Sequence, residues 1–291
     1  MSIARTHPPV VSTFVPAGLP TPQPIADEQR RSSFVELLDH EGLLPFARLS
    51  GRLEGGSMLA NSVDLTHGTT IVALRYADGV VMAGDRRATA GNVIAHRSMQ
   101  KVFAADRWSG VSISGVAGVA TEMVKLFQLE LEHYEKVEGV ALSLEGKATR
   151  LANMIRNNLP MAMQAGMVVI PIFAGYDLRR RQGRIFNYDV TGGRYEELEF
   201  YGTGSGGTYA RSLIKQQWTP NLSRGAAVDL AIRSLFEAAD EDSATGGPDA
   251  MRGIYPTCAT ITVDGYEDVG EAEIADRFAT LLRGSMPVVS P

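Results

Sequence analysis

After Thr69, strand-like and helical segments follow one another in groups, and this order constrains the fold more than any other feature. Apolar and β-branched runs between turn residues indicate strands, and apolar residues at a 3.6-residue period indicate helices. The strand-like segments are 69–76, 80–85, 111–118, 168–177, 183–190, 194–202 and 255–264. The helical segments are 121–139, 143–164, 208–218, 225–242 and 271–284. Because helices come in pairs between groups of strands, we expect an α+β fold of mainly antiparallel sheets with helices on their outer faces.

Two local patterns are clear enough to test. The runs 69–76 and 80–85 flank a turn at Gly79 and predict a β-hairpin. The segment 121–139 predicts an amphipathic helix, because one set of its residues recurs at the helical period. That set is Met123, Leu126, Phe127, Glu130, Leu131 and Tyr134.

Residues 1–68 differ from the rest of the chain. Six of the 14 prolines fall in the first 24 positions, which favours extended and poorly packed chain. Phe34, Leu37 and Leu38 lie at helical spacing, and Gly55-Gly56-Ser57 is typical of a flexible linker. We therefore expect a segment with one short amphipathic helix that cannot form a core alone, followed by one domain at 69–291.

Composition excludes several classes of protein. With 33 acidic and 28 basic residues the net charge is −5, which argues against a nucleic-acid-binding surface. The one basic cluster, Arg179–Arg181, precedes Gln182-Gly183 and predicts a solvated turn.

The single cysteine and the apolar runs bear on the compartment. Cys258 rules out a disulfide within the chain and predicts a buried thiol in a reducing compartment. No stretch reaches the ~18 apolar residues that a membrane helix needs, and the N-terminal prolines argue against export. A cytoplasmic protein that binds neither membranes nor nucleic acid is expected.

Thr69 allows two interpretations. In the first, Thr69-Thr70 simply opens a β-branched strand. In the second, the chain is cut after Gly68, and the new α-amine of Thr69, with a reference pKa of ~7.7–8.0, acts as the base for its own hydroxyl. Gly68 suits such a cut, because without a Cβ it tolerates strained backbone and leaves its carbonyl open to attack.

Three further segments favour the second interpretation. A buried Lys101 beside the nucleophile would lower the pKa of both amine and hydroxyl, and it would need a carboxylate partner such as Asp85. The small residues Ser114–Gly118 offer backbone N–H groups to an oxyanion. Taken singly, Asp85 could be an ordinary turn aspartate, Lys101 a surface lysine, and Ser114–Gly118 a strand-to-helix turn.

Together these motifs resemble a known family. HGTTIVAL, AGDRRAT, KVF, ISGVAG, LELEHYEK and DSATGGPD occur here in the order and spacing of proteasome β-subunit precursors of the actinobacterial type. The resemblance covers about residues 66–265. It implies an N-terminal-nucleophile hydrolase fold, a four-layer αββα sandwich, and a propeptide 1–68 that is removed at Gly68-Thr69.

The resemblance also implies roles for individual residues. Thr69 becomes the nucleophile and base of a threonine endopeptidase, and Gly115 the oxyanion donor. Thr245 stands where many members have serine, so the hydroxyl is kept. The supporting catalytic positions are Asp85, Lys101, Ser205, Asp242 and Thr245. The substrate-binding positions are Ala88, Thr89, Met99, Phe103, Ile113, Ala117 and Thr121, a mostly apolar set that predicts cleavage after apolar or aromatic residues, with loose specificity as the alternative.

Partners follow from the same resemblance. It implies stacked seven-membered rings with proteasome α-subunits outside and other β-subunits beside this one, which enclose a chamber for unfolded protein substrates. The chemistry needs no metal or nucleotide cofactor, and ATP enters only through a separate unfoldase ring.

Two other functions remain to be compared. Gly202–Gly207 matches the G-x-G-x-x-G pattern of dinucleotide-binding oxidoreductases, but a helix follows its helix where a parallel strand is required. A non-catalytic structural β-subunit would be expected to lack Thr69, Asp85 or Lys101, and all three are present.

Overall fold

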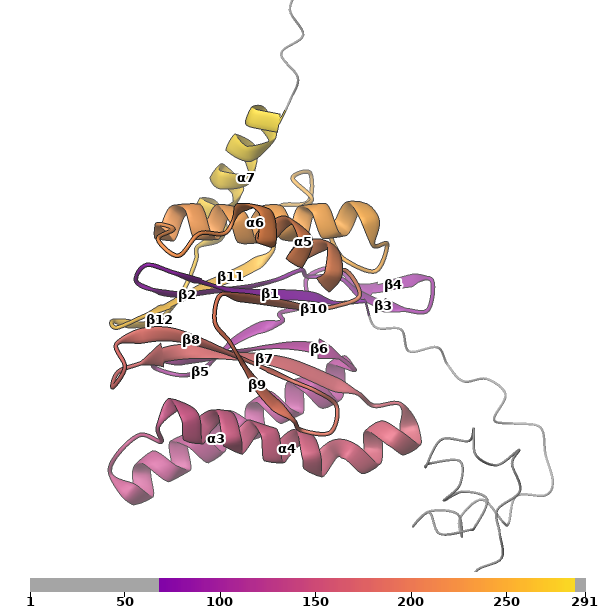
Figure 1. Cartoon of the computed structure of the whole chain (residues 1–291). Coiled ribbons are helices and arrows are strands. Elements are labelled where there is room, and N and C mark those ends of the chain that lie inside the picture. The colour runs from indigo at the N-terminus through magenta and orange to yellow at the C-terminus, as the bar shows by residue number, and fades with distance from the viewer. Residues whose placement is uncertain (1–67, 286–291) are drawn as a thin grey trace, which may run out of the picture. The chain divides into compact units, whose positions relative to one another are not determined.

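The computed structural model describes residues 68–285, so the predicted propeptide up to residue 67, with its helix near residue 34, lies outside the described part. Two five-stranded sheets lie face to face, and helices cover both outer faces (Figure 1). In spatial order, one sheet contains β10 (Phe200–Gly204), β1 (Thr70–Tyr76), β2 (Gly79–Gly84), β11 (Thr257–Thr262) and β12 (Gly265–Asp268). The other contains β5 (Val102–Asp106), β6 (Ser109–Gly115), β7 (Val169–Asp177), β8 (Gln182–Tyr188) and β9 (Arg194–Glu197).

Five helices and one small hairpin complete the described part. The first sheet is covered by α5 (Gly207–Gln217) and α6 (Arg224–Glu241), and the second by α3 (Ala117–Glu138) and α4 (Leu144–Ala165); α7 (Glu271–Ser285) packs against α6 and points away from the sheet. A separate pair, β3 (Ala88–Ala90) and β4 (Val93–His96), projects beside the first sheet. All neighbouring strands run antiparallel, so the expected αββα sandwich is confirmed.

Strand β1 is buried on both faces, which explains its unbroken apolar sequence. Ile71 and Ala73 pack between the two sheets, whereas Val72 and Leu74 pack under α5 and α6. Alternate side chains of one strand thus serve two different core layers.

The helix predicted at 121–139 is longer than expected and buries a narrower face. It begins at Ala117, within a run of small residues that carry no periodic signal. Met123, Phe127 and Leu131 are buried, but Leu126 and Tyr134 are 50% and 37% exposed. The predicted apolar face was therefore partly wrong. Leu126 and Tyr134 each follow a buried residue by three positions, and they lie at the edge of the helix face that packs on the sheet.

The single strand predicted at 194–202 is in fact two strands in different sheets. The chain bends at Leu198-Glu199, so β9 ends the second sheet and β10 begins the first. This crossover has a functional consequence, since it brings the end of β10 beside the start of β1.

Three smaller expectations were correct. The hairpin across Gly79 forms, with Tyr76 paired to Gly79. Arg179–Arg181 form an exposed turn in which Arg181 has a φ of 53°. Cys258 is a buried free cysteine, and burial raises the pKa of its thiol to about 12. Between residues 68 and 285, no helix is long and apolar enough to cross a membrane.

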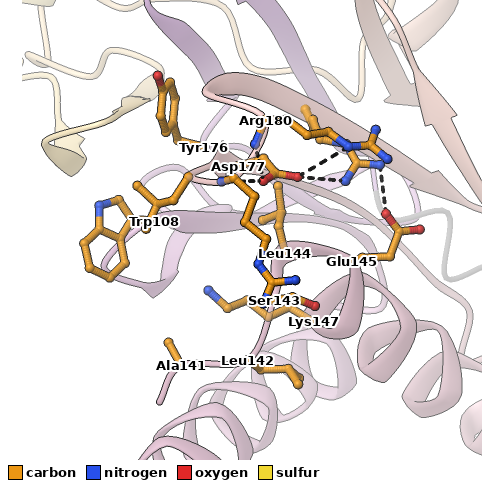
Figure 2. A pocket seen from close by; sticks show the side chains of 13 residues that line it. Trp108, Ala141, Leu142, Ser143, Leu144, Glu145, Lys147, Tyr176, Asp177 and Arg180 are labelled. Carbon is orange, nitrogen blue, oxygen red and sulfur yellow. Dashed lines mark hydrogen bonds and ion pairs between the residues drawn. The ribbon is translucent and has the colours of Figure 1, made fainter.

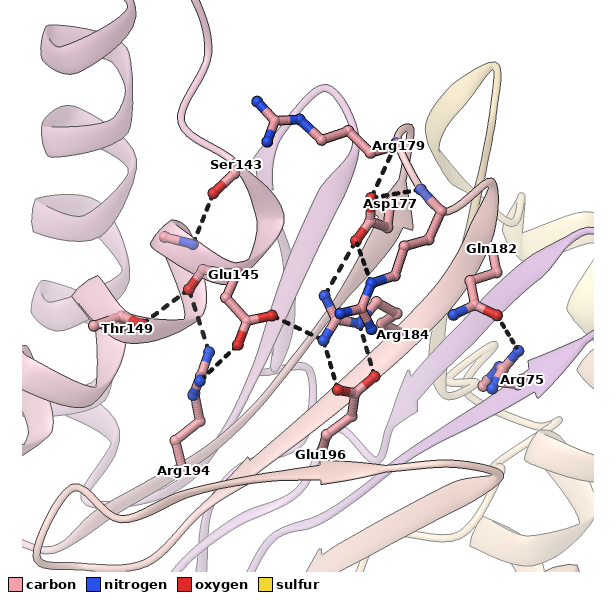
Figure 3. A network of polar contacts seen from close by, with 12 residues as sticks. Arg75, Ser143, Glu145, Thr149, Asp177, Arg179, Gln182, Arg184, Arg194 and Glu196 are labelled. Carbon is pink, nitrogen blue, oxygen red and sulfur yellow. Dashed lines mark hydrogen bonds and ion pairs between the residues drawn. The ribbon is translucent and has the colours of Figure 1, made fainter.

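A buried arginine ties α4 to β8 and β9 (Figure 3). The Arg184 side chain is 3% exposed and donates to Glu145, Asp177 and Glu196 over 2.5–3.1 Å. Hydrogen bonding from Arg184 lowers the pKa of both Glu145 and Glu196. The network therefore holds the start of α4 on the second sheet more strongly when its carboxyl groups are ionised.

We expect this network to make stability fall in acid. The pKa of Glu196 is lower in the folded than in the unfolded chain, so its contribution is complete at neutral pH and is lost as the pH falls below about 5. Glu196→Gln should cost about 1 kcal/mol at pH 7 and less at pH 4. Urea unfolding of the full chain at both pH values measures this. The exposed Glu135→Gln in α3 serves as the control, and an equal cost of Glu196→Gln at both pH values would contradict the assignment.

Candidate active site

Thr69 lies directly before β1, where three segments converge. Its carbonyl accepts a hydrogen bond from the Ser205 N–H over 3.0 Å, at the end of β10. Gly204 has a φ of +98°, and a Cβ there would lie 1.7 Å from the Thr69 carbonyl oxygen. Thr69 is 5% exposed, so the start of β1 is held inside the molecule.

A buried ion pair lies beside this strand start. The Lys101 Nζ is 2.6 Å from Asp85 Oδ1, and the two side chains are 1% and 0% exposed. Asp85 follows β2 directly, and its Oδ2 accepts from the N–H groups of Arg87 and Gly246, both over 2.8 Å. The predicted pairing of Asp85 with Lys101 is confirmed.

Lys101 also contacts the backbone on both sides of the site. Its Nζ donates to the Arg87 carbonyl over 2.5 Å and to the Gly68 carbonyl over 3.5 Å. Burial lowers the pKa of Lys101, and the attraction and hydrogen bond of Asp85 oppose that shift. The ammonium is therefore directed at the bond between Gly68 and Thr69.

Gly68 is closely packed. A Cβ at this position would lie 2.0 Å from the Ala244 Cβ and 2.4 Å from the Ala244 carbonyl oxygen. Its N–H donates to Thr89 Oγ1 over 3.0 Å. Close contact with Ala244 therefore requires glycine at position 68, in addition to the reasons that the sequence gives.

A second polar group forms around Asp242, at the end of α6. Its Oδ2 accepts hydrogen bonds from the Ser205 hydroxyl and, over 2.5 Å, from the Thr245 hydroxyl. Its Oδ1 accepts from the Ala244 N–H over 3.1 Å. The structure therefore brings Ser205, Asp242 and Thr245 together, as their places in the motifs predict.

Thr70 is the residue that sequence reasoning missed, because it served there only as a strand opener. It is fully buried, and its N–H donates to Asp85 Oδ1 over 2.8 Å. Its Oγ1 lies 2.6 Å from Thr245 Oγ1 and accepts from the Gly206 N–H over 2.9 Å. The repeated threonine was the only signal in the sequence.

Gly115 ends β6 with a φ of +109°, and a Cβ there would lie 2.1 Å from the Val168 carbonyl oxygen. Only glycine fits this turn from β6 into α3. Its part in binding an oxyanion stays a prediction.

The predicted substrate-binding residues come from β3, β5, β6 and α3 and from the loop before β5. Ala88 and Thr89 are buried on β3, Met99 and Phe103 are half-buried on either side of Lys101, and Ile113 is buried under α3. Thr121 donates to the Ala117 carbonyl over 2.9 Å in the first turn of α3. Their role in specificity stays a prediction.

The dinucleotide interpretation of Gly202–Gly207 has no structural support. Strand β10 pairs antiparallel with β1, and α6, not a parallel strand, follows α5. Gly204 and Gly206 instead allow close approach to Thr69, Thr70 and Thr245.

A pocket lies beside Trp108, the residue directly before β6, and Tyr176 (Figure 2). It has a volume of about 420 Å³, and Trp108, Ser143 and Tyr176 are among its lining residues. Its two buried cations are already paired, Lys147 with Asp106 and Arg184 with its three carboxylates. No catalytic group is left unpaired there, so the site before β1 is the better candidate. Within the described range 68–285, no three His, Cys, Asp or Glu side chains are grouped to hold a metal ion.

Comparison with known proteins points the same way. Residues 65–251 match the family model described as "Proteasome subunit". A protein of Acidimicrobium ferrooxidans named "Proteasome subunit beta" is 61% identical over 210 residues, which are 72% of this chain and 77% of that protein. A protein of the same name from Streptomyces griseus is 52% identical over 253 residues, 86% of this chain and 88% of that protein.

Proposed function

Because the chain belongs to the proteasome subunit family, we propose that it is a catalytic β-subunit of a proteasome core particle. In this proposal it is a threonine endopeptidase, made as a precursor that cuts itself between Gly68 and Thr69. The alignment with the Streptomyces relative covers 253 residues of this chain, whereas the predicted mature part, 69–291, has only 223 residues (291 − 68 = 223). The alignment therefore extends into the segment before Thr69.

One observation carries the proposal: a fully buried lysine is paired with Asp85 and lies 3.5 Å from the carbonyl oxygen of Gly68. An ammonium is costly to bury, and this one contacts the carbonyl of the bond that precedes Thr69. Such a charge suits the stabilisation of an oxyanion on Gly68.

The hydrogen-bond partners of Lys101 suit the ammonium form, in opposition to the effect of burial. Nζ faces three acceptors, namely Asp85 Oδ1 and the carbonyls of Arg87 and Gly68. An ammonium has three donors and no acceptor, so it satisfies this set fully. Lys101 would then act by its charge, and the base must be another group.

Self-cleavage follows as an acyl shift. Thr69 Oγ forms a bond to the Gly68 carbonyl carbon, the C–N bond breaks, and the hydroxyl proton goes to the leaving nitrogen. Water hydrolyses the resulting ester, which leaves a Gly68 carboxylate and a free Thr69 α-amine.

Peptide cleavage then uses the new α-amine. It has a reference pKa of ~7.7–8.0, which the neighbouring ammonium lowers, so that it accepts the Thr69 hydroxyl proton near neutral pH. The hydroxyl attacks the substrate carbonyl, the amine protonates the leaving nitrogen, and water hydrolyses the acyl-enzyme. Gly115 N–H binds the oxyanion, and Ser205 with Asp242 and Thr245 supports the amine.

The family membership also supports the wider setting. The subunit would assemble with α-type and β-type subunits in stacked heptameric rings in the cytoplasm. An ATP-dependent unfoldase would deliver unfolded proteins, which are cut after apolar or aromatic residues. The alternative is a non-catalytic β-subunit that only completes the ring, and Thr69, Asp85 and Lys101 count against it.

The intact mass of the subunit after co-expression with its α-type partner tests self-cleavage. We expect the wild-type chain to lose residues 1–68, and Thr69→Ala to keep them and to have no peptidase activity. Thr69→Ser is the matched control, since it keeps a hydroxyl and should still be processed.

Two results would contradict the proposal. A cut at another bond would assign the nucleophile elsewhere, and peptidase activity that Thr69→Ala leaves unchanged would exclude Thr69 from the reaction.

A further inference from the structure

Thr70 uses every polar group it has. Its N–H donates to Asp85 Oδ1 over 2.8 Å, and its carbonyl accepts from the Asp85 N–H over 3.1 Å. Its hydroxyl contacts Thr245 Oγ1 and the Gly206 N–H. One residue thus connects the Asp85–Lys101 pair with the Asp242 group.

The direction of the hydroxyl chain follows from counting protons. A hydroxyl has one proton, and that of Thr245 is donated to Asp242 Oδ2. In the contact between Thr70 and Thr245, therefore, Thr70 must be the donor. The chain runs from the Gly206 N–H to Thr70, then to Thr245, and ends on the Asp242 carboxylate.

The series of hydrogen bonds is closely packed where it begins, at Gly206. A Cβ on Gly206 would lie 2.7 Å from both Thr70 Oγ1 and Thr245 Oγ1. No side chain fits between these groups, so the two hydroxyls are held against the backbone at the start of α5.

Strand alternation shows what this anchoring does for Thr69. Val72 and Leu74 face the helices α5 and α6, and Ile71 and Ala73 face the space between the sheets. By the same alternation Thr70 belongs to the helix face, where Thr245 holds it, and Thr69 to the inter-sheet face. Fixing Thr70 on one face therefore sets the direction of Thr69 on the other.

We propose that Thr70 is a positioning residue for the nucleophile: its hydroxyl anchors the strand end on Asp242 and so fixes Thr69 between Lys101 and Ser205. This inference rests on the proposed function, since it presumes that Thr69 reacts. Thr70 itself does not touch the substrate.

The test compares two pairs of variants in assembled particles that contain mature subunits. The first pair is wild type and Thr70→Val, and the second is Thr70→Ser and Thr70→Ala. The members of each pair differ mainly by the hydroxyl group. Loss of the hydroxyl should lower kcat about 10–100-fold, because a misplaced nucleophile costs that much, and should change KM less than about twofold. Thr70→Ser should stay within about threefold of wild type. Activity is expressed per mature subunit, counted by intact mass, so that incomplete processing does not count as slow turnover.

A second measurement separates positioning from general destabilisation. Thr70→Val and Thr245→Val remove successive links of one chain, so the double variant should lose no more kcat than the worse single variant. The acid limb of the kcat/KM profile should shift in Thr70→Val and return to its wild-type position in Thr70→Ser, because the Thr69 amine has changed its surroundings.

The outcomes distinguish this inference from the proposed function. If Thr69→Ala keeps activity, the proposed function is wrong. If Thr69→Ala is inactive but both hydroxyl pairs have equal kcat, or if the double variant shows additive losses, Thr70 does not position Thr69.

Discussion

Replacing Lys101 with methionine is expected to stop removal of residues 1–68 and therefore to abolish peptide hydrolysis, because the Thr69 α-amine is never freed. Methionine keeps most of the buried stem, but it removes the charge that contacts Asp85 and the Gly68 carbonyl. Without that charge, the hydroxyl of Thr69 loses its main cause of a lowered pKa, and the oxyanion on Gly68 loses its counter-charge. Hydrolysis of an apolar fluorogenic peptide, together with intact mass, measures both effects.

The same substitution leaves Asp85 buried and unpaired, which by itself costs about 3–5 kcal/mol. A double variant separates stability from chemistry. Lys101→Met with Asp85→Asn has no buried charge at this position and should recover much of the lost stability, but it should stay inactive. Lys136→Met removes an exposed cation paired with Glu132 and should behave as wild type. Recovery of turnover in the double variant would show that Lys101 acts only through folding.

The sequence predicted the part of the site that is encoded in short motifs. Thr69 and Asp85 lie at the ends of two strand-like runs that form one local hairpin, so turn chemistry and alternation were enough to place them. Lys101 was placed by its short motif and by the family resemblance. Their meeting is a consequence of strand order, which the family resemblance supplied.

Contacts between distant segments could not be read in this way. Thr70 and Thr245 are 175 positions apart, and nothing in the local spacing of either hydroxyl indicates the other. The bend at Leu198-Glu199 is another case, because an alternating pattern predicts extended backbone but not the sheet to which it belongs. That bend places Ser205 at the site, so the largest error about the fold concerned a segment on which the site depends.

Gly204→Ala is expected to have the second large effect. The residue has a φ of +98°, and a Cβ would lie 1.7 Å from the Thr69 carbonyl oxygen, a backbone atom that cannot rotate away. Alanine must push β10 away from β1 or change its own conformation, and either change breaks the hydrogen bond from the Ser205 N–H to Thr69. We expect a loss of several kcal/mol in the free energy of unfolding, by analogy with other strained core substitutions, and no processed subunit.

The control for Gly204→Ala is a glycine of ordinary conformation. Gly118, in the first turn of α3, has no atom within 4 Å of an added Cβ, so Gly118→Ala should be neutral or stabilise by up to about 1 kcal/mol. Thermal unfolding of both full-length variants, followed by intact mass after co-expression, makes the comparison. Normal processing of Gly204→Ala would mean that β10 can move away from Thr69 without harm. In that case the crossover from β9 to β10 would not be what positions Ser205 for catalysis.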